Sequence, residues 1–120
     1  MTKLNKYGVY EDVPADLLVK GVKFRLEVNL IDIKDGMWTH GLHYEWGGCG
    51  VGSRGGGHNP SLSTPRFSTK YAARCFACER LRIELMRTIR DKDFHKTASM
   101  IAARALKALN LVAPGQLRLF

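Results

Sequence analysis

Apolar and polar residues alternate over residues 22–30 and again over 38–46, within two neighbouring stretches, 22–33 and 37–46, that we expect to be strands. A period of two residues is typical of a β-strand with one buried face. Asp35-Gly36 separates the stretches and marks a turn between antiparallel strands. The pattern therefore predicts a β-hairpin.

The positions of the large apolar residues predict the register of this hairpin. A three-residue loop over 34–36, with Gly36 at positive φ, collects them on one face. The expected apolar pairs are Phe24 with Trp46, Leu26 with Tyr44 and Val28 with Leu42. The same register places Arg25 opposite Glu45, and Glu27 opposite His43, on the outer face, where opposite charges stabilise the pairing slightly.

The alternating pattern ends after the hairpin, where a glycine-rich segment begins. Seven of the eleven residues from Gly47 to Gly57 are glycine, and glycine loses the most conformational entropy when it is ordered. We therefore expect a long glycine-rich loop over 47–65, whose length is typical of a functional or a disordered segment. Before the hairpin, Val13 to Leu18 predicts a short turn or helix.

Two helices are expected in the second half, over about 68–90 and 94–109, with Ser68 as the cap of the first. The face of the first helix that covers the hairpin is expected to consist of Tyr71, Cys75, Cys78, Leu85, Met86 and Ile89. The predicted fold class is α+β, with an antiparallel hairpin or small sheet covered by two helices. Residues 1–110 form one basic domain, and 111–120 form a flexible tail.

Composition limits the class of protein. A hydrophobic fraction of 45% and a charged fraction of 25% are ordinary for a globular domain of 120 residues. No apolar run has the length of a membrane span, and the first residues lack the pattern of a signal peptide. We expect a cytoplasmic protein without a membrane partner.

The net charge of +8 lies entirely in the second half. Residues 1–65 contain seven basic and seven acidic residues, and residues 66–120 contain twelve basic and four acidic ones, so 12 − 4 = +8. Such asymmetry favours contact with the backbone of DNA or RNA, although it can also serve solubility alone. The candidate phosphate-binding residues are Arg54, Arg66, Lys70, Arg74, Arg80 and Arg87.

Candidate chemistry is sparse. Cys49, His58, Cys75 and Cys78 are the ligand types of a zinc site, but a helical position for Cys75 and Cys78 favours buried thiols instead. Neither a nucleophile with an oriented base nor a pair of carboxylates is evident. We therefore expect neither a catalytic site nor a cofactor, and the zinc site stays an alternative.

The last five residues form a motif. Ala113-Pro114-Gly115 interrupts the helix and is followed by Gln116-Leu117-Arg118-Leu119-Phe120. This pentapeptide resembles the motif Gln-Leu-any-Leu-Phe, through which bacterial replication and repair proteins bind the DNA sliding clamp. Gln116, Leu117, Leu119 and Phe120 match the four specified positions, and Arg118 fills the variable one, where Ser or Asp is commoner.

The resemblance implies that Gln116 binds in a polar notch of the clamp, that Leu117 packs at its rim, and that Leu119 and Phe120 fill an apolar cleft. An alternative is that Leu117, Leu119 and Phe120 fold back onto the domain's own core. The order of hairpin, glycine-rich loop and helices also resembles small phage proteins of unknown role. The expected function is that of a non-catalytic, nucleic-acid-associated accessory protein in DNA replication, tethered to the clamp. The alternative is a phage-encoded, anti-CRISPR-type inhibitor that contacts a host nucleoprotein complex.

Overall fold

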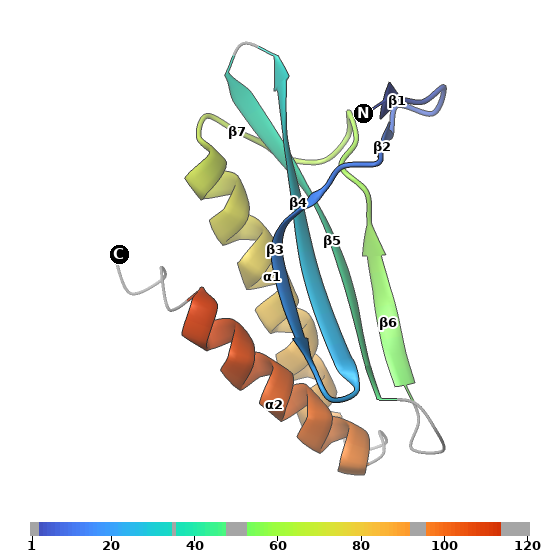
Figure 1. Ribbon diagram of the computed structural model, residues 1–120, viewed down its shortest axis with the longest axis vertical. Coiled ribbons are helices and arrows are strands. Elements are labelled where there is room, and N and C mark those ends of the chain that lie inside the picture. Colours follow the sequence, from blue (N-terminus) through green and yellow to red (C-terminus); the bar gives the residue numbers. More distant parts are fainter. Residues whose placement is uncertain (1–2, 35, 48–52, 92–95, 114–120) are drawn as a thin grey trace.

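An antiparallel sheet and two helices form the two layers of the protein (Figure 1). The computed structural model describes residues 3–34, 36–47, 53–91 and 96–113. The main sheet has the order β3-β4-β5-β6, and β7 also pairs with β5. The bounds are Ala15–Gly21 (β3), Phe24–Lys34 (β4), Met37–Gly47 (β5), Ser53–His58 (β6) and Arg66–Phe67 (β7). The predicted α+β class is confirmed.

The predicted hairpin is β4 and β5, and its register is confirmed from Phe24 opposite Trp46 to Asp32 opposite Trp38. Gly36 has the expected positive φ, at 74°. The structure departs from the prediction beside the turn, where an irregularity between Asp32 and Lys34 lets Lys34 pair with Met37. The loop is therefore shorter than the three residues expected.

Two strand-forming segments were predicted wrongly. Residues 15–21 form β3 and pair with β4, where a turn or helix was expected. Residues 53–58 form β6 and pair with β5, where the prediction was a loop over 47–65. Backbone hydrogen bonds to β5 compensate for the entropy cost of ordering the glycines of β6. Strands β1 (Lys3–Leu4) and β2 (Tyr10–Glu11) form a separate small sheet.

The helices are α1 (Lys70–Arg90) and α2 (Lys96–Val112). The cap of α1 is Thr69, one residue after the Ser68 expected: its hydroxyl accepts a hydrogen bond from the amide of Ala72 at 3.0 Å. Helix α2 continues past residue 110, and Ala113 is buried. Neither helix in the described part of the chain is long and apolar enough to cross a membrane.

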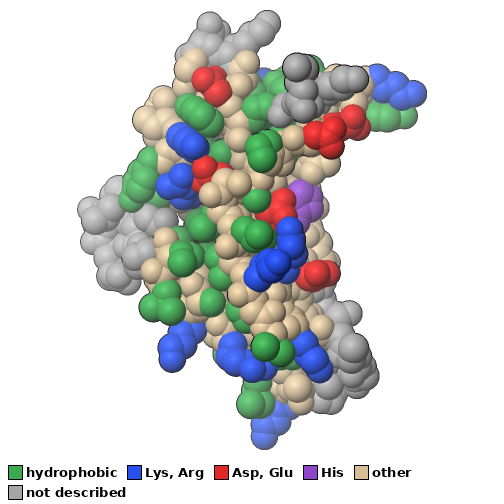
Figure 2. Space-filling model, viewed as in Figure 1, with side chains coloured by type: hydrophobic (Ala, Val, Ile, Leu, Met, Phe, Trp, Pro, Cys, Tyr) green, Lys and Arg blue, Asp and Glu red, His purple; other side chains and the backbone are tan. Residues whose placement is uncertain are grey.

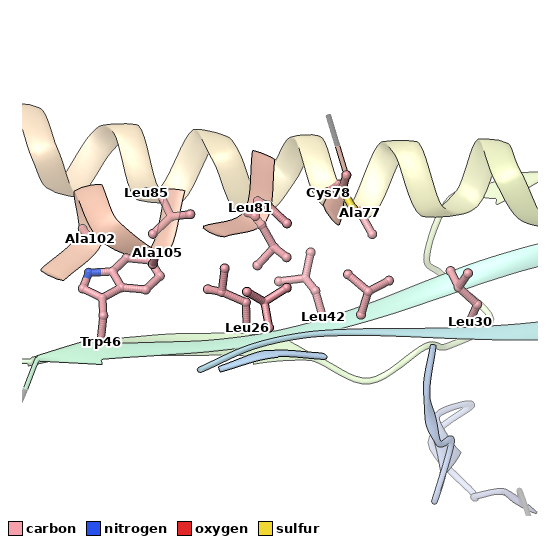
Figure 3. Close-up of a cluster of buried hydrophobic side chains, with 14 of the residues drawn as sticks. Leu26, Leu30, Leu42, Trp46, Ala77, Cys78, Leu81, Leu85, Ala102 and Ala105 are labelled. Atoms are coloured by element: carbon pink, nitrogen blue, oxygen red, sulfur yellow. The ribbon is translucent and has the colours of Figure 1, made fainter. Parts of the chain in front are cut away.

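The core lies between the helices and one face of the sheet (Figure 3). Leu26, Leu42 and Trp46 point from the strands toward α1 and α2. The buried face of α1 differs from the expected one. Tyr71, which was expected to be buried, is half exposed, and the buried residues include small side chains that were not expected there. The buried residues of α1 are Ala73, Ala77, Cys78, Leu81, Leu85 and Thr88. Small side chains here allow the helix to lie close to the sheet.

Candidate nucleic-acid interface

Four of the predicted phosphate-binding residues have partners within the described part of the chain. Lys70 and Arg74 lie at the start of α1 and both contact Asp16 of β3, with distances of 3.2 Å from Lys70 Nζ to Oδ1 and 2.8 Å from Arg74 Nε to Oδ2. Burial alone would raise the pKa of Asp16, but hydrogen bonds from Arg74 and Lys70 outweigh it and lower that pKa. These two basic residues therefore join α1 to β3.

Two more of the predicted residues also have partners within the chain. Arg87 pairs with Glu84 at 2.8 Å, one turn earlier on α1. Arg66 donates to the carbonyl oxygen of Leu62 at 3.3 Å, although its side chain is exposed. Arg54 lies in β6 opposite Trp46, and its side chain is outside the described part of the structure.

Arg80 differs from this group. Its side chain is exposed, and it has neither an ion pair nor a hydrogen bond with the residues that the structure describes. It lines a cleft of about 150 Å³ between α1 and the edge of the sheet, together with His58 and Tyr44. Leu42, Gly57 and Glu84 complete the lining, and Glu84 is the partner of Arg87. Among the described residues, Arg80 is thus an exposed cation without an ion-pair partner, beside a recess.

A buried histidine contacts His58, one of the residues that line this cleft. His40 of β5 is 1% exposed, and its ring centroid lies 5.1 Å from those of His58 and Phe76, in edge-to-face contacts. Among the described residues no group hydrogen-bonds its Nδ1. Burial, followed by repulsion from His58 and Arg80, lowers the pKa of His40 to about 4. His40 is therefore neutral near pH 7.

Strand β6 supplies the backbone of the same edge. It ends the strand order of the sheet, so one side of its backbone has no strand partner among the residues that the structure describes. Gly55, Gly56 and Gly57 carry no side chains that would cover this backbone. A β-carbon on Gly56 would come within 2.8 Å of the Tyr44 hydroxyl, so glycine at that position leaves room for the tyrosine. The edge therefore offers amide donors and Arg80 to an approaching anion.

Exposed basic residues continue beyond the cleft. Arg87 and Arg90 lie in the last turn of α1, and Lys96 begins α2. Figure 2 shows Lys and Arg side chains prevailing over Asp and Glu in the lower part of the view, around the start of α2. The helix dipole favours the cations Arg87 and Arg90 at the C-terminal end of α1.

The alternative zinc ligands are not brought together among the described residues, where no group of three metal-ligating side chains is found. Cys78 is buried in the core, and burial raises the pKa of its thiol to about 11. A metal binds the thiolate, which this environment disfavours. Cys75 is half-buried on α1, and His58 lies at the end of the edge strand β6. Cys49 lies outside the described residues.

Three residues around α1 were missed by the sequence prediction: Asp16, His40 and Tyr44. Asp16 was missed because 13–18 was not expected to be a strand. His40 and Tyr44 could have been found from the alternation of β5, which places both on the face of Leu42. The clamp-like residues Gln116, Leu117, Leu119 and Phe120 lie outside the described part of the chain.

Comparison of the chain with protein-family models, curated proteins and solved structures found no match. Two features of this chain's own residues bear on its function: Arg80, which has no ion-pair partner among the described residues, at a glycine-rich sheet edge, and the pentapeptide at 116–120.

Proposed function

We propose that this is a cytoplasmic, non-catalytic accessory protein that binds a nucleic-acid backbone and is tethered to the bacterial DNA sliding clamp. The edge formed by β6 and α1 binds the phosphates, and residues 116–120 bind the clamp. The observation that carries the nucleic-acid part is Arg80, an exposed cation with no ion-pair partner among the described residues, beside the open backbone of β6.

Electrostatics supports a backbone contact rather than base recognition. All of the +8 net charge comes from the half of the chain that contains both helices. Basic side chains that neutralise phosphates release counterions, and this makes binding independent of sequence and strongly dependent on salt. Amide groups along β6 add donors to phosphate oxygens.

The tether follows from the chemistry of the pentapeptide. Leu119 and Phe120 are suited to an apolar cleft, where burial of each side chain stabilises a complex by about 1.5–3 kcal/mol before the cost of ordering the peptide. A contact of roughly micromolar affinity is expected. Simultaneous binding of the clamp and of the DNA that it encircles raises the apparent affinity of both weak contacts.

The first prediction concerns this tether. Phe120→Ala is expected to weaken binding of the full-length protein to purified clamp about 10-fold, because the largest apolar side chain of the motif is removed. Arg118→Ala is the matched control, since residue 118 fills the variable position, and its affinity should equal that of the wild type. Isothermal titration calorimetry measures both. Equal affinities of the wild type and Phe120→Ala would refute the tether.

A further inference from the structure

An open groove runs along the side of α1 between Glu79 and Asp91. Its volume is about 750 Å³, and Ile83 and Met86 supply its apolar surface. Arg82, Arg87 and Arg90 complete the lining with the two acidic residues. Ile83 is 37% exposed, which leaves apolar surface that a second segment could cover.

Arg82 fixes the end of α2 at the wall of this groove. Its Nε donates to Asn110 Oδ1 at 2.8 Å, and its Nη2 donates to the carbonyl oxygen of Ala113. Its side chain is only 12% exposed and also contacts Glu79. Residue 113 is the last that the structure describes. The segment 114–120 therefore starts beside the groove.

The segment is long enough to follow the groove. Seven extended residues span up to about 23 Å, whereas Arg82 and Arg90 are about 12 Å apart along the helix axis. Pro114 and Gly115 follow Ala113 directly and favour a change of direction. The apolar residues Leu117, Leu119 and Phe120 can thus reach Ile83 and Met86.

We propose that the groove on α1 is a docking site for residues 116–120 of the same chain. Leu119 and Phe120 cover Ile83 and Met86, and Arg82 holds the start of the segment in place. The functional consequence rests on the proposed clamp binding: the docked segment is withheld from the clamp, and the clamp competes with the groove for the same side chains. The apparent affinity for the clamp then falls by the fraction of molecules whose segment is undocked.

Methyl NMR of the full-length protein tests the docking without the clamp. The wild type is expected to show nuclear Overhauser effects from the Phe120 ring to the methyl groups of Ile83 and Met86. The double variant Leu119→Ser/Phe120→Ser should shift the signals of these methyl groups and leave the Met100 methyl, on α2 and exposed, unchanged. Absence of the Overhauser effects together with unchanged Ile83 and Met86 signals would overturn the docking.

A clamp titration measures the competition. Ile83→Ser is expected to tighten clamp binding about 3- to 10-fold, because the segment is released from the groove. Met100→Ser is the matched control and should bind as the wild type does. Equal affinity of Ile83→Ser and the wild type would contradict the competition. A clamp that binds none of these proteins would refute the proposed function, and the NMR experiment decides the docking in either case.

Discussion

Gly57→Ala is expected to lower the free energy of unfolding by about 3 kcal/mol or more. Gly57 has φ = 132°, a conformation that side chains disfavour. An added β-carbon would also overlap the carbonyl oxygen of Leu42 and lie 2.7 Å from the Cα of His43, both in the backbone of β5. Neither obstacle can move without breaking the pairing of β5 with β6.

Gly55→Ala is the matched control within the same strand. There the nearest atoms to an added β-carbon are the Tyr44 carbonyl oxygen at 3.3 Å and the Glu45 Cβ at 3.5 Å, and φ is not in the positive range. The expected change in the free energy of unfolding is within about 1 kcal/mol. Urea denaturation followed by circular dichroism measures both variants. Similar stabilities for the two variants would mean that β6 does not pair with β5 as described.

The second large effect is a loss of stability in mild acid caused by His40. The pKa of His40 is lowered from its ordinary value of 6.5 to about 4 in the folded protein, so the unfolded chain binds a proton more readily between these values. The contribution of neutral, buried His40 to the free energy of unfolding is complete above pH 6.5 and is lost as the pH falls toward 4. Between pH 7 and pH 5 the free energy of unfolding should fall by about 2 kcal/mol from this group.

His40→Leu tests this expectation because leucine has no proton to bind. Between pH 7 and pH 5, the free energy of unfolding of this variant should fall by about 2 kcal/mol less than that of the wild type. His43→Gln, on the opposite face of β5, is the control and should retain the wild-type loss. Urea denaturation across this pH range provides the comparison. An unchanged pH dependence in His40→Leu would show that His40 is not held neutral in the folded protein.

The hairpin could be predicted because its evidence is local. Alternation along 22–33 and 37–46 and the position of Gly36 determine which residues can face the core, and a shift by one residue would reverse every side chain. The helices were found for a similar reason, although Thr69 rather than Ser68 caps α1.

The other elements depend on contacts that are distant in sequence. Half of the residues of strand β6 are glycine, and only its pairing with β5 makes it a strand. The buried face of α1 differs from the predicted one because close packing against the sheet favours small residues such as Ala73 and Ala77 over larger ones. The charge count identified six candidate cations, but only the fold reveals that Lys70 and Arg74 share Asp16 and that Arg80 has no such partner among the described residues.

We propose above all that the edge at Arg80 binds a nucleic-acid backbone. The most direct test is fluorescence anisotropy of a labelled oligonucleotide, single-stranded and duplex, titrated with wild type, Arg80→Gln and Arg74→Gln over a series of salt concentrations. We predict steeply salt-dependent binding by the wild type. In Arg80→Gln the affinity should fall about 5-fold and the slope of log K against log salt should decrease by about 1. In Arg74→Gln, where Lys70 still pairs with Asp16, the affinity and the salt slope should both stay close to those of the wild type. Binding that does not depend on salt, or equal losses in the two variants, would contradict the claim.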